Sequence, residues 1–189
     1  MPDIRADDIA DFDLAVLGGA LPPEVESLIS RAGLMRAQVA AAQALLDEAH
    51  ARAPRHPATL IALYRFHFYG NRLAQARDVS FRALACASAA LGLPEDWREV
   101  APDARFEALE AVPRFYLFSL KGMAYLSLRL GELDLGRGAL AKLAQLDPKN
   151  RVGHQVLHDV LARMGRDDLG YEDCPDISPD IARRSGVAA

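Results

Sequence analysis

The chain has 189 residues, of which 51% are hydrophobic and only 7% aromatic, and its formal net charge is −4 at pH 7. This length suits one domain with a continuous core, and the negative charge argues against a general nucleic-acid-binding protein, which would normally be basic. Abundant alanine, together with the lack of strand-like runs of Val, Ile and Thr, favours an all-α fold.

Cysteine use, the first residues and the hydropathy pattern all predict a cytoplasmic protein. The two cysteines, Cys86 and Cys174, form no metal or redox motif, which suits a reducing compartment. The first residues, MPDIRADDIADFD, are acidic, whereas a signal peptide begins basic and then becomes apolar. The most apolar long stretch, residues 112–130, contains three basic residues, so no membrane span is expected.

The N-terminal part is predicted to form an acidic arm and a first pair of helices. Residues 1–21 carry five aspartates around the apolar patch FDLAVL, which predicts an acidic arm. Two prolines followed by glutamates predict a helix over 23–32, because both suit a helix N-terminus. Gly33 is predicted to end this helix. An alanine-rich helix follows over about 35–53 and stops at Pro54.

A second pair of helices is predicted after Pro57. The helix over 58–69 contains LIALYRFHFY and is apolar on nearly every face, and a longer helix over 72–91 follows the turn at Gly70. Gly70 precedes Leu73 by three residues, whereas the third pair of helices has a spacing of two at its turn, between Gly131 and Leu133. This difference leaves the rotation of the helix over 58–69 open by one position.

An insertion over 92–112 separates the second and third pairs of helices. Residues 94–97, with the sequence PEDW, predict a short capped turn, and Asp103 is a candidate cap for a further helix that runs through Leu109. Trp97 is the only tryptophan. We interpret it as a core residue between neighbouring pairs of helices, and a binding anchor is the alternative.

The stretch 117–150 has the strongest pattern, with two amphipathic runs joined at a glycine turn. Its sequence is LFSLKGMAYLSLRLGELDLGRGALAKLAQLDPKN. The pattern-forming residues are Gly131, Leu133, Gly136, Leu140, Leu143 and Pro148, at spacings of two, three, four, three and five. A lone helix over 152–165 is expected to follow as a cap, and the polar residues 166–189 form an acidic tail that is expected to be flexible.

This order resembles the second half of a tetratricopeptide repeat: a turn glycine, a large apolar residue, a small residue at the helix crossing, two apolar residues and a closing proline. The repeat is a helix-turn-helix of roughly 34 residues that stacks on its neighbours. The resemblance implies an all-α, TPR-like solenoid over residues 22–165, with about three hairpins and a C-terminal capping helix. Residues 23–56 then form a degenerate first repeat.

The same resemblance implies a concave binding face lined by the first helix of each hairpin. In the family, positions two, five, nine, twelve and thirteen of each repeat line this face. On the third hairpin these are Phe118, Lys121, Tyr125, Leu128 and Arg129, and on the second they are Ala58, Ile61, Arg65, Phe68 and Tyr69. The residues expected to bind a partner are Arg65, Phe68, Tyr69, Phe118, Lys121, Tyr125 and Arg129.

Helix geometry alone also places Lys121, Tyr125 and Arg129 on one face, because they stand four residues apart. Basic and aromatic side chains on two facing helices predict a groove for a carboxylate or an acidic, extended peptide. The alternative is that Tyr125 and Phe68 are core residues and that the cations are surface residues that extend to solvent. Neither helix contains the asparagines of the peptide-clamp members, so their clamp chemistry does not carry over.

No catalytic set, cofactor motif or metal site is predicted. His154 and His158 stand four residues apart and share one helix face, but no third ligand accompanies them at a fixed spacing, so structural roles are favoured. His67 is expected to be a core histidine with one hydrogen-bond partner. His50 and His56 flank Pro54 and are expected to lie in a solvated loop.

The sequence therefore predicts a non-enzymatic adaptor or chaperone-like scaffold for a protein or peptide partner, without nucleic acid or membrane. One alternative is a homodimer formed through the apolar faces of the helices over 58–69 or 72–91, and another is a metal-dependent enzyme built on the histidine pair. The acidic tail segment 167–173 is a candidate competitor for the groove. The segments LIALYRFHFYGNRLAQAR and LPEDW resemble small uncharacterised bacterial proteins of nitrogen-fixing organisms.

Overall fold

The computed structural model describes residues 21–108 and 110–167, with side chains as far as residue 162. Within these ranges all regular structure is α-helical, so the all-α prediction is confirmed for this part of the chain. None of the described helices is both long and apolar enough to cross a membrane. The predicted acidic arm and acidic tail lie outside the described residues, except for residues 21, 166 and 167.

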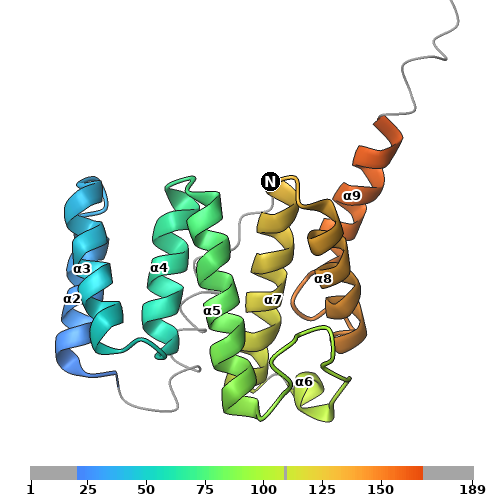
Figure 1. The fold of residues 1–189 in the computed structure, drawn as a ribbon, viewed down its shortest axis with the longest axis horizontal. Coiled ribbons are helices and arrows are strands. Elements are labelled where there is room, and N and C mark those ends of the chain that lie inside the picture. Colours follow the sequence, from blue (N-terminus) through green and yellow to red (C-terminus); the bar gives the residue numbers. More distant parts are fainter. Residues whose placement is uncertain (1–20, 109, 168–189) are drawn as a thin grey trace, which may run out of the picture. The chain divides into compact units, whose positions relative to one another are not determined.

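Three helical hairpins form the first of two units, which ends at His154 (Figure 1). The hairpins are α2 (Pro23–Leu34) with α3 (Val39–Arg52), α4 (Pro57–Tyr69) with α5 (Leu73–Leu91), and α7 (Ala111–Arg129) with α8 (Leu133–Leu146). α3 packs on α4 and α5 packs on α7, so neighbouring hairpins contact each other in chain order. The short α6 (Ala104–Ala108) packs against α7, and α9 (Gln155–Asp167) belongs to the second unit.

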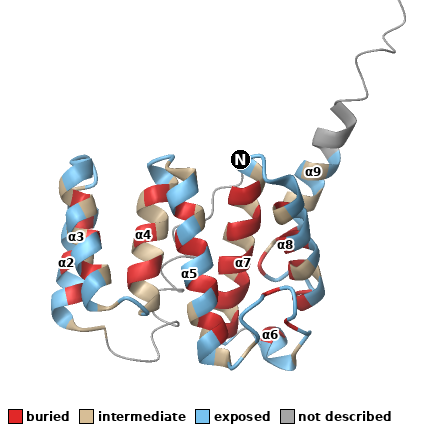
Figure 2. Cartoon of the chain, in the orientation of Figure 1, coloured by how far each residue is buried: buried red, intermediate tan, exposed pale blue. Residues whose placement is uncertain are grey.

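The core is concentrated around α7, which packs against both α5 and α8. Ten of its 19 residues are buried, and Tyr116, Leu120 and Met123 are fully inaccessible (Figure 2). The first hairpin instead closes on a small cluster of Val25, Leu28 and Ala49. Because apolar burial is the main stabilising contribution, the α5–α7–α8 region contributes more stability than the first hairpin.

The turns of the second and third hairpins have the same hydrogen bonds. Asn71 N–H donates to the Phe68 carbonyl (3.0 Å), and Gly131 N–H donates to the Leu128 carbonyl (3.1 Å). Both residues have positive φ, 55° and 82°, and each stands two residues before the first leucine of the next helix. Asn71, rather than Gly70, thus takes the left-handed position, which asparagine tolerates better than most residues. The rotation of α4 therefore matches that of α7.

Two boundaries in the first hairpin differ from the prediction. α2 continues through Gly33 to Leu34, and α3 begins at Val39 rather than near Met35. Gln38 N–H donates to the Met35 carbonyl (2.7 Å), which forms a separate turn between the helices. Gly33 has an ordinary negative φ, so it does not act as a helix terminator there.

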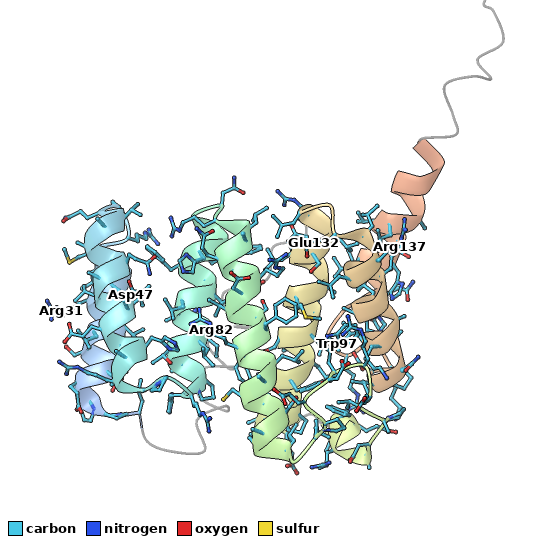
Figure 3. All side chains as sticks on the ribbon, in the orientation of Figure 1. Arg31, Asp47, Arg82, Trp97, Glu132 and Arg137 are labelled. Atoms are coloured by element: carbon cyan, nitrogen blue, oxygen red, sulfur yellow. The ribbon has the colours of Figure 1, made fainter. Side chains whose placement is uncertain are left out.

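The insertion folds against the third hairpin. Asp96 Oδ1 accepts the Arg98 N–H (2.9 Å), and Asp103 Oδ1 accepts the Arg105 N–H (2.8 Å), so both predicted caps are confirmed. Trp97 is only 6% exposed and packs beside Gly138 of α8 (Figure 3). The burial predicted for Trp97 is thereby confirmed, and Gly138 beside it belongs to the third hairpin.

The segment after α8 is a loop where the sequence predicted the first turn of a helix. The buried Asp147 carboxylate accepts the Arg151 N–H (3.0 Å) and the Val152 N–H (2.9 Å). His154 is also buried, with Nε2 3.0 Å from the Asp147 carbonyl oxygen. α9 therefore begins at Gln155, three residues later than expected.

Candidate functional site

Four aromatic rings from the first helices of the second and third hairpins lie together. This aromatic cluster consists of Tyr64, Phe68 and Tyr69 of α4 and Tyr125 of α7. Ring centroids are 5.6 Å apart between Tyr64 and Phe68, which stack, and 5.5 Å apart between Phe68 and Tyr69. Phe68 and Tyr125 are 6.0 Å apart and join the two helices. The two predicted rows of side chains therefore meet.

Tyr64 belongs to this cluster although it is not among the residues that the sequence predicts to bind a partner. Its ring lies against Gly122 of α7, where a Cβ atom would stand 3.1 Å from the Tyr64 hydroxyl. Burial raises the pKa of Tyr64 well above its ordinary value. The available signal was the spacing of four between Tyr64 and Phe68, which places both rings on one helix face, opposite a glycine.

Exposed side chains border the cluster on one side. Tyr69 is 66% exposed. Arg129 is also exposed, and its Nη1 donates to the Tyr125 hydroxyl (2.8 Å) while its guanidinium lies 5.8 Å from the centre of that ring. A guanidinium that is held over an aromatic ring keeps donors available for a carboxylate. This border therefore presents both a ring and a cation to solvent.

The remaining predicted residues are placed differently. Lys121 is half-buried, and its Nζ donates to the Val152 carbonyl (2.6 Å), so it fastens the loop after α8. Arg65 and Phe118 are half-buried, one turn before Tyr69 on α4 and one turn before Gly122 on α7 respectively. Of the seven predicted residues, Phe68, Tyr69, Tyr125 and Arg129 form one connected group.

The histidines near the second hairpin have structural roles. His67 is buried, and its Nδ1 accepts a hydrogen bond from Arg72 Nε (3.1 Å), as predicted for a core histidine. The expectation of a solvated loop was wrong for His50, whereas His56 does lie in the loop before α4 but is half-buried there. His50 lies within α3, with Nε2 3.0 Å from Arg82 Nη1, and His56 Nδ1 accepts the Ala58 N–H (3.3 Å) at the start of α4.

The described residues contain no cluster of three or more His, Cys, Asp or Glu side chains that could hold a metal ion. His154 contacts a backbone carbonyl in the first unit, whereas His158 lies on α9 in the second unit. Cys86 is half-buried, and its thiol donates to the Arg55 carbonyl (2.9 Å). Burial raises the pKa of this thiol, which makes it a poor nucleophile at neutral pH.

Comparison with known proteins identifies a relative. No protein-family model and no solved structure matches the chain. A curated protein described as the uncharacterized 19.8 kDa protein in the nifW 5′ region of Azotobacter chroococcum mcd 1 is 41% identical over 162 residues, which cover 82% of this chain and 89% of the relative. The chain belongs to the same family as this Azotobacter protein.

Proposed function

We propose that this protein is a non-enzymatic adaptor of TPR-like architecture that binds an acidic, extended segment of a partner protein across α4 and α7. In such a stack, the first helices of successive hairpins line one face. The matching turns of the second and third hairpins support this arrangement. So does Gly136, where an added Cβ would lie 2.5 Å from Leu128 of α7, because the repeat requires a small residue at that crossing.

The charge of α4 and α7 is the reason for proposing an acidic partner. Neither α4 nor α7 contains an aspartate or glutamate, although the chain has 26 acidic residues. The arginines and lysines of these helices are Arg65, Arg114, Lys121 and Arg129, and Arg129 contacts Tyr125 of the aromatic cluster. Arginine donors favour carboxylates, and the rings favour apolar side chains of an extended peptide. This acid-free, ring-lined surface is the observation on which the proposal rests.

Fluorescence anisotropy with two labelled decapeptides tests this proposal. One probe alternates glutamate with leucine, and the other alternates lysine with leucine. The acidic probe should bind more tightly, and Arg65→Glu/Arg129→Glu should weaken its binding at least tenfold (about 1.4 kcal/mol). Lys121 is left unchanged in this variant because it also holds the Val152 carbonyl.

The matched control is Arg31→Glu/Arg137→Glu, which changes the net charge equally at exposed positions on α2 and α8 (Figure 3). It should retain most of the affinity, because these cations lie outside the proposed site. Equal binding of the two probes, or equal loss in the two double variants, would show that the site does not select acidic peptides.

The relative's gene lies in the nifW 5′ region, and we extend the proposal to a role associated with nitrogen fixation. Deletion of that gene in Azotobacter chroococcum should slow growth on dinitrogen and leave growth on ammonium unchanged. Complementation with the wild-type gene should restore growth, whereas complementation with a variant that has lost its groove cations should not. Equal growth of the deletion strain on both nitrogen sources would contradict the proposed role in nitrogen fixation.

A homo-oligomer is the second candidate, and it rests on exposed apolar residues at the end of the first hairpin. Leu34 is 87% exposed and Val39 is 51% exposed. Large exposed apolar patches on a protein surface mark association sites. Light scattering should then give a dimer that dissociates in Leu34→Ser/Val39→Ser, and a monomeric wild-type protein excludes this candidate.

A further inference from the structure

A cavity of about 470 Å³ lies where the α3–α4 connection meets α5 and the start of α7. It is formed by a different set of residues from the aromatic cluster. Its wall includes Pro54, Arg55, Cys86, Ala90, Val112 and Phe115. These walls are predominantly apolar and include no acidic residue. A pocket of this size and character accepts one or a few apolar groups.

The first described residue, Leu21, is connected to the cavity wall through one shared cluster of core residues. Leu21 packs against the cluster of Val25, Leu28 and Ala49, and Ala53 packs against the same cluster. Ala53 also lines the cavity. Residues 12–17, with the sequence FDLAVL, lie four to nine residues before Leu21, and an extended chain of that length spans up to roughly 14–30 Å. This apolar patch is therefore within reach.

Charge complementarity also favours residues 11–17 as the occupant of the cavity. Asp11 and Asp13 flank Phe12 in the sequence, and the exposed Arg55 lies on the cavity wall. A guanidinium and a carboxylate form a strong, directional pair. Attachment to the same chain further raises the effective concentration of the segment to the order of millimolar. Gly18 and Gly19 join the patch to Leu21 and allow the chain to turn.

We propose that residues 11–17 dock in this cavity, with Phe12 against the apolar wall of α5 and α7 and with Asp11 and Asp13 beside Arg55. The docked segment would then cover Cys86, which lines the cavity. The proposal does not depend on the peptide-binding groove, which is built from other residues.

The labelling rate of Cys86 by iodoacetamide tests this docking in the full chain with Cys174→Ser. Phe12→Asp/Leu17→Asp should raise the rate at least tenfold, because the segment would leave the cavity. Arg55→Glu should also raise it, whereas a local charge effect alone would slow labelling by disfavouring the thiolate. Combining Arg55→Glu with Asp11→Arg/Asp13→Arg should restore protection.

Ile4→Asp/Ile9→Asp is the matched control, since it adds the same charge to the arm outside the patch and should leave the rate unchanged. Urea unfolding of every variant separates undocking from loss of the fold. Equal rates in the wild type and Phe12→Asp/Leu17→Asp, or an equal rise in the control, would overturn the proposal and leave the cavity for another occupant.

A second measurement changes the cavity wall instead of the docking segment. Ala90 is exposed at the edge of the cavity on α5, so Ala90→Trp should obstruct it without disturbing the core. The ¹H–¹⁵N heteronuclear NOE of residues 11–17 should fall in this variant because the segment loses its site. Unchanged NOE values would also contradict the docking.

Discussion

Gly136 is the point at which α8 comes close to α7. A Cβ atom added there would lie 2.5 Å from Leu128 Cδ2 and 3.2 Å from the Ala124 carbonyl oxygen. Gly138, on the same helix, has room, because a Cβ there would stand 3.6 Å from the Trp97 ring. The two glycines therefore differ in the cost of a side chain.

Gly136→Leu should lower the free energy of unfolding by about 1–3 kcal/mol, because the new side chain must displace Leu128. Gly138→Ala should raise it by about 0.5–1 kcal/mol, because alanine favours the helix and fits in the space available. Urea denaturation of both variants checks this pair. The opposite order of stabilities would show that α7 and α8 do not cross at Gly136.

Asp147 holds the loop after α8 through two backbone hydrogen bonds. Asp147→Ala should lower the free energy of unfolding by about 2–3 kcal/mol, because the buried Val152 N–H loses its charged acceptor. Asp147→Asn keeps one acceptor oxygen and should cost less. The same denaturation series measures both variants, and equal stability of the alanine variant and the wild type would refute this role for Asp147.

At the scale of single residues, the sequence could predict those residues whose role follows from local spacing. Gly136, Asp96, Asp103 and Trp97 behave as their patterns indicate. Tyr64 was missed because its place depends on Gly122, a residue of a different helix that is remote in the sequence. Lys121 was predicted as a binding residue from the TPR resemblance and from helix geometry, and neither indicates its hydrogen bond to the Val152 carbonyl of a distant loop.

At the scale of elements, the contact between α3, α4 and α5 contains two histidines next to arginines. Burial, and then Arg82, lower the pKa of His50, while Asp47 on α3 partly offsets this effect (Figure 3). Burial, and then Arg72, lower the pKa of His67, while Asp47 partly offsets this effect and Arg82 adds a smaller lowering. Both imidazoles are therefore favoured in the neutral form when the protein is folded.

Stability should consequently fall as the pH decreases below 6.5, the ordinary histidine value. The unfolded chain takes up protons first in this range, because its histidine pKa values are higher than those of the folded chain. His50→Gln/His67→Gln should reduce the difference in the free energy of unfolding between about pH 8 and about pH 5.5. Urea denaturation at both pH values measures the change in the free energy of unfolding. An equal change in the variant and the wild type would exclude these histidines as the source of the pH dependence.

Element types and most helix ends follow from capping residues, prolines and apolar periodicity. α4, α5 and α8 therefore agree closely with the prediction. The first hairpin and the start of α9 do not, because a turn at Met35 and a loop fastened by Asp147 replace helix at those places. The Met35 turn is closed by a backbone hydrogen bond, and the later loop by the Asp147 carboxylate, and apolar periodicity encodes neither contact.

At the scale of the whole chain, stability should differ between hairpins. The first hairpin closes on a small cluster, whereas α7 is buried against both α5 and α8. Hydrogen exchange should therefore be more than tenfold faster for amides of α2 and α3 than for those of α7, because local opening there exposes less apolar surface. Uniform protection across all three hairpins would instead indicate a single cooperative unit.

The fold could be predicted further than the function. Apolar periodicity and turn residues determine helices and hairpins, and they are visible in one chain. A binding face depends on which side chains from separate helices meet, such as Phe68 and Tyr125, and its occupant depends on a second molecule. The acidic character of the proposed partner follows only from the charge of α4 and α7.

The most direct test of this account is a titration of ¹⁵N-labelled protein with the acidic glutamate–leucine peptide, followed by amide chemical shifts. The account predicts shifts concentrated on α4 and α7 around Tyr69, Tyr125 and Arg129, with loss of these shifts in Arg65→Glu/Arg129→Glu. Shifts confined to α8 or to the outer face of α5, or no shifts at saturating peptide, would contradict it.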